Sequence, residues 1–156
     1  MKISYGKSVH GEEEIEAVVN VLRNSTQMGK NVSKFENKIA KMYNKKYGVM
    51  LNSASSALMI AFEVIDIIKG SEIITPALTF GTTVSSIIKN GFKPVFVDVK
   101  ANTFCINEDL IEKAINKKTK AICIPNLIGN LPNWKKISTI AKKHNLVVIE
   151  DSADTL

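Results

Sequence analysis

Three short segments of the chain carry side chains that could bind a ligand, and the first is a run of small residues. Residues 52–57 read Asn-Ser-Ala-Ser-Ser-Ala and lead into an amphipathic segment. Small side chains at the start of a helix let an anion approach free backbone N–H groups, and serine hydroxyls add hydrogen-bond donors. The run predicts a phosphate-binding turn, although a serine that caps its own helix without any ligand would leave the same pattern.

The second segment contributes an aromatic ring and the third contributes carboxylates. Phe80 lies in the stretch 75–83, where its ring could either stack on a flat ligand or join the hydrophobic core. Residues 150–154 read Glu-Asp-Ser-Ala-Asp and directly follow an apolar run. A buried carboxylate needs a partner, and either a cationic ring nitrogen or the N-terminus of a helix could supply it. The residues alone leave both alternatives open.

Alternating strands and helices are predicted to position these segments. Short runs that are apolar on both faces are typical of a parallel sheet covered by helices. The predicted strands are residues 47–51, 72–75, 94–97, 121–124 and 146–149, and the predicted helices between them are residues 55–68, 81–90, 108–116 and 133–143. Gly70, Gly91 and Asn145 stand at or just past helix ends, where a left-handed residue is favoured. The pattern predicts an α/β fold, in which ligands bind at the carboxyl ends of the strands.

Two more helices are predicted before this alternation begins. Residues 12–23 have helical apolar spacing and three glutamates in the first turn, where the helix dipole favours anions. A second helix is predicted to begin after Asn31, and residues 25–29 between the two are predicted as a loop.

The composition excludes several classes of protein. A chain of 156 residues fits one compact domain with a real hydrophobic core. No apolar run approaches the roughly 20 residues that span a bilayer. The N-terminus lacks the apolar stretch of a secretory signal. We therefore expect a cytoplasmic protein without a membrane partner.

Charge and cysteine content argue against nucleic-acid and metal binding. The net charge of +6 comes almost wholly from lysine, with Arg23 as the single arginine, and the lysine pairs are scattered along the chain. Such a distribution is typical of a solvated surface rather than of a nucleic-acid interface. Cys105 and Cys123 are too few and too far apart for a metal-binding pattern, and Cys123 is expected in the core.

Taken in order, several segments resemble the DegT/DnrJ/StrS family of enzymes that depend on pyridoxal 5'-phosphate (PLP), known as sugar aminotransferases. The segments are Met28-Gly29 with Phe35-Glu36, residues 52–58, Thr75-Pro76 with Thr79-Phe80, residues 94–99 and residues 149–153. The resemblance implies the aspartate-aminotransferase fold, or PLP fold type I, a mostly parallel sheet flanked by helices. Residues 1–156 would then be the N-terminal portion of the large domain that binds PLP, or its amino form pyridoxamine 5'-phosphate (PMP).

The resemblance also implies roles for five residues. Ser55 and Ser56 would offer backbone N–H groups, with their hydroxyls, to the cofactor phosphate. Phe80 would stack on the pyridine ring, and Asp151 would pair with the ring nitrogen. Asp154 stands where the family commonly has a glutamine or histidine that reaches the phenolic oxygen of the cofactor.

The resemblance further implies an activity and an assembly. The family moves an amino group from a donor such as glutamate to a keto sugar carried by a nucleotide, as a homodimer, in polysaccharide biosynthesis. The lysine that binds the cofactor covalently follows a further strand, so we expect it beyond residue 156 and expect no catalytic residue, and no activity, in this chain alone. Asp154 and residues 127–134 favour a second branch, the nucleotide-sugar 3-dehydratases. A non-catalytic interaction domain is a third hypothesis.

Overall fold

The computed structural model describes residues 7–27 and 29–155, which belong to two compact units. The first unit ends at Met50 and the second begins at Leu51. Met28, which belongs to one of the segments of the family resemblance, lies outside the described residues. That all 156 residues form part of one cofactor-binding domain stays a prediction.

The first unit contains two amphipathic helices, α1 (Glu12–Asn24) and α2 (Lys30–Met42). At the start of α1 the Glu14 carboxylate accepts a hydrogen bond from the backbone N–H of Gly11 at 2.6 Å, which satisfies a donor that the helix itself cannot. Both predicted helices are confirmed. The first ends one residue later than predicted, and the second begins at Lys30 rather than after Asn31.

The predicted strand at residues 47–51 is wrong, because this segment is irregular. Tyr47 and Val49 are about three-quarters exposed, and no strand among the described residues pairs with this segment. The segment lies against α2 instead. The backbone N–H of Met50 donates to Glu36 Oε1 at 2.7 Å, and a Cβ at Gly48 would lie 2.5 Å from the Glu36 carbonyl oxygen. A close approach to the α2 backbone, which only glycine permits, therefore holds this segment in place, and sheet pairing does not.

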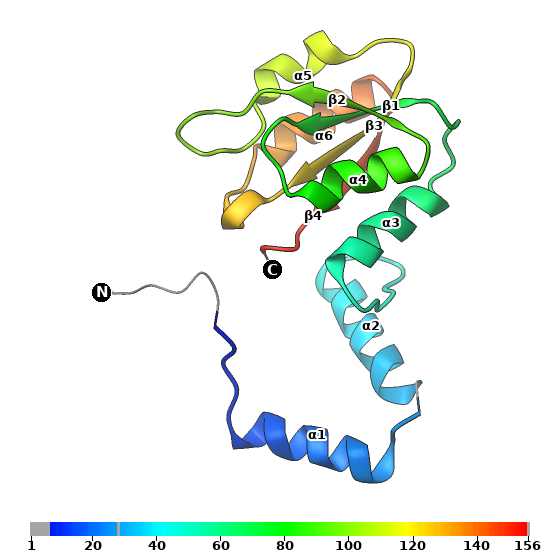
Figure 1. The fold of residues 1–156 in the computed structure, drawn as a ribbon, viewed down its shortest axis with the longest axis vertical. Coiled ribbons are helices and arrows are strands. Elements are labelled where there is room, and N and C mark those ends of the chain that lie inside the picture. The colour runs from blue at the N-terminus through cyan, green and yellow to red at the C-terminus, as the bar shows by residue number, and fades with distance from the viewer. Residues whose placement is uncertain (1–6, 28, 156) are drawn as a thin grey trace. The chain divides into compact units, whose positions relative to one another are not determined.

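The second unit is built on a parallel four-stranded sheet in the order β2-β1-β3-β4 (Figure 1). The strands are β1 (Glu72–Pro76), β2 (Lys93–Val97), β3 (Thr119–Pro125) and β4 (Val147–Asp151). The four remaining strand predictions are thus confirmed, with small shifts at the ends. Because all four strands run in the same direction, their carboxyl ends meet at one edge of the sheet.

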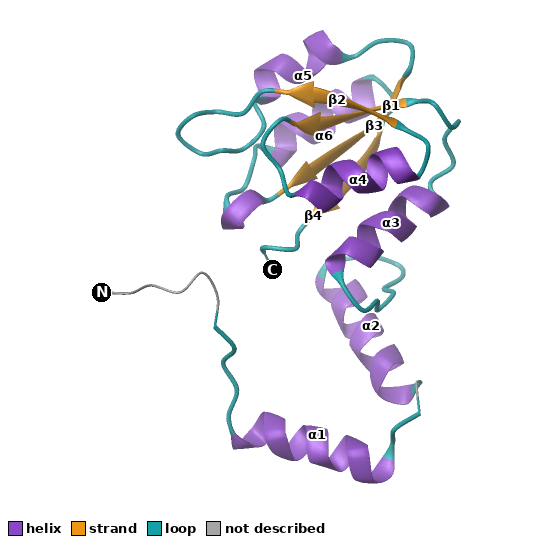
Figure 2. Ribbon diagram, viewed as in Figure 1, coloured by secondary structure: helices purple, strands orange, loops and turns teal. Residues whose placement is uncertain are grey.

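Helices cover both faces of this sheet (Figure 2). One face carries α3 (Ala54–Val64) and α4 (Gly81–Lys89), and the other carries α5 (Glu108–Ala114) and α6 (Trp134–Lys143). The α3 helix ends before the predicted residue 68, because Ile65 adopts an extended conformation. Gly70, Gly91 and Asn145 all have positive φ, as the helix-end pattern predicted.

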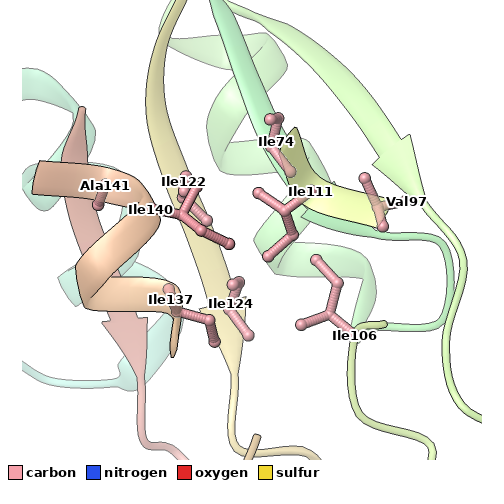
Figure 3. Packing of buried hydrophobic residues seen from close by; sticks show 9 residues of the cluster. All are labelled: Ile74, Val97, Ile106, Ile111, Ile122, Ile124, Ile137, Ile140 and Ala141. Atoms are coloured by element: carbon pink, nitrogen blue, oxygen red, sulfur yellow. The ribbon is translucent and has the colours of Figure 1, made fainter. Parts of the chain in front are cut away.

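Each face of the sheet has its own hydrophobic core. On the α3 and α4 face, Phe62 and Ile87 pack against Ile73 and Cys123, which confirms the buried position predicted for Cys123. Figure 3 shows the cluster on the α5 and α6 face. Its members are Ile74, Val97, Ile106, Ile111, Ile122, Ile124, Ile137, Ile140 and Ala141. Successive strand residues therefore serve opposite faces, as a sheet buried on both sides requires.

Within the described part of the chain, no helix combines the length and the apolar character that crossing a membrane would demand.

Candidate functional site

A hollow of about 300 Å³ lies between the first turns of α3 and the end of β4. Its walls are Ala54, Ala57, Leu58 and Ala61 of α3, and residues 149–153. The volume is near the lower end of the roughly 300–1,000 Å³ that ligand pockets occupy. Small alanine side chains on the helix leave this space open next to the Asp151 carboxylate.

The N-terminus of α3 is one wall of this hollow, and serines define where the helix begins. Ser53 is the N-cap: its Oγ accepts a hydrogen bond from the backbone N–H of Ser56 at 3.1 Å and donates to Ser56 Oγ at 3.1 Å. The helix-cap alternative is therefore realised, and it occupies the backbone N–H of Ser56. Within the described residues, the backbone N–H groups of Ala54 and Ser55 have no hydrogen-bond partner. These two N–H groups are free to bind an anion at the positive end of the helix.

Asp151 is the last residue of β4 and is only 8% exposed. Its Oδ2 accepts a hydrogen bond from Thr83 Oγ1 at 3.1 Å, and its Oδ1 accepts one from the backbone N–H of Ala153 at 3.2 Å. In the described chain, no lysine, arginine or histidine forms an ion pair with it. A buried carboxylate without a cation is costly, so this position suits a cationic partner from a ligand.

The Asp151 carboxylate lies on the α3 and α4 side of the sheet. Its partner Thr83 lies in the first turn of α4, and Thr83 is fully buried. Burial raises the pKa of the Cys123 thiol on the same face, and the charge of Asp151 raises it further. Cys123 therefore stays a protonated core residue and offers no nucleophile to the site.

Phe80 directly precedes α4 and is 68% exposed. The core alternative for Phe80 is therefore wrong, because the residue is exposed and is not a member of either hydrophobic cluster described on the two faces of the sheet. Phe80 follows β1 at the carboxyl edge, where the buried hydroxyl groups of Thr75 and Thr79 have no hydrogen-bond partner among the described residues. Stacking of Phe80 on a ligand stays a prediction.

Asp154 is exposed, and its carboxylate has a partner within the chain. Its Oδ2 accepts a hydrogen bond from the backbone N–H of Ile128 at 2.9 Å. Ile128 has a φ of 57°, a left-handed conformation that is costly for a β-branched residue. Asp154 thus helps to hold a strained turn after β3, and it is not among the residues that line the hollow. A cofactor contact from Asp154 stays a prediction.

Two residues of this region were not predicted from the sequence. Thr83 is the buried partner of Asp151, but a threonine inside a helix gives no signal of such a contact. Asn126 is buried directly after β3 and bonds to residues on both sides of Asp151. Its place at a strand end was a usable signal, since ligand-site residues follow the strands of such sheets.

The fold and these residues together define a ligand-binding α/β protein. Its sheet edge offers free N–H groups at a helix N-terminus for a phosphate, a hollow, and a buried carboxylate for a cation. The described residues fit PLP, which carries a phosphate at one end of a flat ring and a nitrogen that can be protonated.

The chain belongs to the DegT/DnrJ/EryC1/StrS aminotransferase family, whose model matches residues 8–156. It is 34% identical over 152 residues to the spore coat polysaccharide biosynthesis protein SpsC of Bacillus subtilis, a match that covers 97% of this chain and 39% of SpsC. The predicted family membership is thus confirmed.

Solved structures confirm the predicted fold as well. Helicobacter pylori PseC, an aminotransferase of pseudoaminic acid biosynthesis, matches all of this chain and 43% of its own, with a TM-score of 0.91 and 31% identity. The E. coli GDP-4-keto-6-deoxy-D-mannose-3-dehydratase with bound hydrated PLP matches 95% of this chain and 40% of its own, with a TM-score of 0.88 and 31% identity. The fold is therefore that of PLP fold type I enzymes. The chain spans about two-fifths of the length of these relatives.

Proposed function

We propose that this chain is part of a PLP-dependent enzyme that transfers an amino group from an amino acid, such as glutamate, to a keto sugar carried by a nucleotide. The observation that supports this most directly is the buried Asp151 carboxylate, which has no cation in the described chain and borders a hollow at a helix N-terminus. Polysaccharide biosynthesis in the cytoplasm, by a homodimer, is part of the same proposal.

The phosphate of the cofactor would bind at the start of α3. The N–H groups of Ala54 and Ser55 are free there, and the half-buried hydroxyls of Ser55 and Ser56 add further donors. The positive end of the helix dipole adds a favourable interaction with an anion. These groups would hold one end of the cofactor without a lysine or arginine.

Asp151 would set the protonation state of the ring. A carboxylate next to a pyridine nitrogen raises the pKa of that nitrogen and keeps it protonated. A protonated PLP ring accepts electron density from a neighbouring carbon that loses a proton, which is the chemistry that this cofactor supplies. Thr83 and the backbone of Ala153 hold the carboxylate in place, while Phe80 would cover the ring and exclude water.

The substitution Asp151→Asn tests this role in the whole protein, meaning the natural polypeptide that contains residues 1–156. The variant keeps the shape and the acceptor oxygen for Thr83 but loses the charge. We expect amino transfer to fall on the order of 100-fold, the usual loss when an electrostatic catalytic group is removed, with little change in melting temperature. Turnover of glutamate and a nucleotide-linked keto sugar measures the effect.

Asp98→Asn is the matched control, since Asp98 also follows a strand at the same edge but is exposed and bonds to its neighbouring backbone N–H. We expect this control to retain wild-type turnover. Unchanged turnover in Asp151→Asn would remove the proposed role of the carboxylate.

A nucleotide-sugar 3-dehydratase is the second candidate, because solved relatives with almost equal similarity carry each activity. Mass spectrometry of the product separates the two. An aminotransferase product gains nitrogen at the keto carbon and keeps the other hydroxyls, whereas a dehydratase product has lost a hydroxyl. Failure of the whole protein to bind PLP at all would favour a non-catalytic interaction domain.

A further inference from the structure

Asn126 is the most completely bonded polar side chain near the candidate site. It is 2% exposed and directly follows β3. Its Oδ1 accepts a hydrogen bond from Trp134 Nε1 at 2.8 Å, and its Nδ2 donates to Glu150 Oε1 at 2.8 Å and to Ser152 Oγ at 3.0 Å. Both ends of the amide are thereby committed, so the side chain has a single orientation.

The same residue contacts the chain around Asp151 through its backbone. The backbone N–H of Asn126 donates to the carbonyl oxygen of Asp151 at 2.9 Å, which continues the β3 to β4 pairing by one residue. A weaker side-chain contact reaches Thr155 Oγ1 at 3.3 Å. Asn126 therefore bonds to Asp151 itself, to the residue on each side of it, and to the turn that follows.

We call the hydrogen bonds of Asn126 to Glu150, Ser152 and the Asp151 backbone the clamp, and the geometry of the strand shows from which face of the sheet the clamp acts. Neighbouring side chains on a strand point to opposite faces, so Glu150 points away from the face that Asp151 serves. Ser152 follows the strand and donates from its Oγ to Glu150 Oε1 at 3.0 Å. Asn126 holds these two from the side of α6, to which Trp134 belongs. Thr83 of α4 holds the Asp151 carboxylate from the opposite side. If the clamp were released, the end of β4 could rotate and turn the carboxylate out of the hollow.

We propose that Asn126 is a positioning residue that fixes the direction of the Asp151 carboxylate toward the cofactor ring. This inference rests on the proposed function, because it assumes that the hollow binds PLP. Asn126 itself does not touch the cofactor; it acts through Glu150, Ser152 and the Asp151 backbone.

The substitution Asn126→Asp in the whole protein tests the proposal. It keeps the oxygen that accepts from Trp134 but replaces the donor to Glu150 by a carboxylate, which repels that residue. With 15N-labelled PLP, the chemical shift of the ring nitrogen reports its protonation as a function of pH. A misdirected Asp151 raises the pKa of this nitrogen less, so we expect the ring to lose its proton about one pH unit lower than in the wild type, together with about tenfold weaker PLP binding.

Trp134→Phe is the matched control, because it removes the other hydrogen bond of Asn126 and leaves the Nδ2 contacts intact. We expect it to lower the melting temperature by an amount similar to that of Asn126→Asp, while the titration of the ring nitrogen and the affinity for PLP stay at wild-type values. Equal titration curves and equal affinities in all three proteins would overturn the positioning role and leave Asn126 as a structural residue.

Glu150→Ala and Glu150→Gln examine the other end of the clamp if Asn126→Asp does not fold. Alanine removes the acceptor, whereas glutamine keeps an acceptor oxygen without the charge. We expect the ring-nitrogen titration of Glu150→Ala to shift toward lower pH and that of Glu150→Gln to lie closer to the wild type. Identical shifts would show that the charge of Glu150, not its bond to Asn126, matters, and would contradict the proposal.

The outcome also separates this inference from the proposed function. A wild-type protein that binds no PLP overturns both. A wild-type protein that binds PLP through a protonated ring, beside an Asn126→Asp variant with the same titration and affinity, overturns only the role of Asn126.

Discussion

The Asp151 carboxylate accepts two hydrogen bonds and still lacks a compensating charge within the part of the chain that the structure describes. The hydroxyl of Thr83 and the backbone N–H of Ala153 each occupy one oxygen, and an ionised carboxylate can accept about four hydrogen bonds. Such partners reduce the cost of burial but do not cancel it. A residue with this environment is easier to explain by a ligand than by folding stability.

Phe80 offers a test of the site that does not depend on Asp151. Because Phe80 is 68% exposed, truncation in Phe80→Ala should change the melting temperature of the protein without cofactor by only about a degree. If the ring stacks on PLP, the variant should bind PLP roughly tenfold more weakly, since such contacts contribute about 0.5–1.5 kcal/mol beyond area burial. Titration of the visible absorption of bound PLP measures the affinity.

Leu78→Ala is the control for this prediction, because Leu78 is an exposed apolar residue of the same loop. We expect it to bind PLP as the wild type does. A Phe80→Ala protein that melts much earlier without cofactor, but binds PLP normally, would speak against the stacking role.

At the scale of elements, the sequence predicted what depends on local patterns. The positive φ values of Gly70, Gly91 and Asn145 follow from the need to end helices, and the apolar runs of β1 to β4 follow from burial on both faces. The strand predicted at residues 47–51 is wrong because no strand in the described part of the chain pairs with it, and strand pairing is a tertiary property that periodicity does not contain.

The candidate site follows the same rule. Asp151 and Phe80 became candidates because each follows a predicted strand, and the family resemblance supplied the roles proposed for them. The contact of Thr83 with Asp151 joins residues 68 positions apart, so it depends on the packing of α4 against the sheet. The free N–H of Ser55 and the occupied N–H of Ser56 also required the actual cap geometry.

Glu108 connects the start of α5 to the segment before α6, and its charge makes the stability of this connection depend on pH. It opens α5, is 3% exposed, and accepts hydrogen bonds from Lys100 Nζ and from the backbone N–H of Asn133 at 2.7 Å. Burial acts to raise the pKa of this carboxyl group, but the hydrogen bonds from Lys100 and Asn133 outweigh burial and hold the pKa below its ordinary value of 4.5. The group thus joins the start of α5 to the segment before α6 in its charged form.

The sign of the effect follows from this lowered pKa. The ionised carboxylate stabilises the fold above the ordinary value of 4.5, and this contribution disappears as the pH falls through the lower pKa of the folded state. We expect Glu108→Gln to cost about 1 kcal/mol of unfolding free energy at pH 7, a modest value because Lys100 is partly hydrated. The difference from the wild type should shrink below pH 4.5.

The free energy of unfolding, measured with denaturant at a series of pH values from about 3 to about 7, tests the Glu108 effect in the whole protein. Glu63→Gln is the control, since Glu63 is an exposed carboxylate on α3 without an ion pair among the described residues. A Glu108→Gln penalty that stays constant across this pH range would contradict the proposed ion pair.

At the scale of the whole molecule, the hollow exists because the sheet brings distant parts of the chain together. Residues 54–61 of α3 precede all four strands in the sequence and residues 149–153 comprise the end of β4 and the two residues after it, yet both segments line the hollow. The order β2-β1-β3-β4 places the end of β4 at the outer strand of the described sheet, on the face that α3 and α4 cover. A ligand bound there must therefore contact segments from both ends of the second unit.

This arrangement predicts which amide hydrogens a bound cofactor protects from exchange. In the whole protein, PLP at about ten times its Kd or more should slow hydrogen–deuterium exchange, measured by mass spectrometry, in residues 53–58 and in residues 150–153 by about tenfold or more. The reason is that a ligand bound only by the closed state stabilises that state by RT ln(1 + [L]/Kd). Residues 134–143 of α6 lie on the opposite face and should be unaffected. Pyridoxal, which lacks the phosphate, should protect residues 53–58 less than PLP does, since the phosphate is the group expected to interact with the N-terminus of α3. Protection confined to α6, or identical protection by both compounds, would show that PLP does not bind in the hollow between α3 and β4.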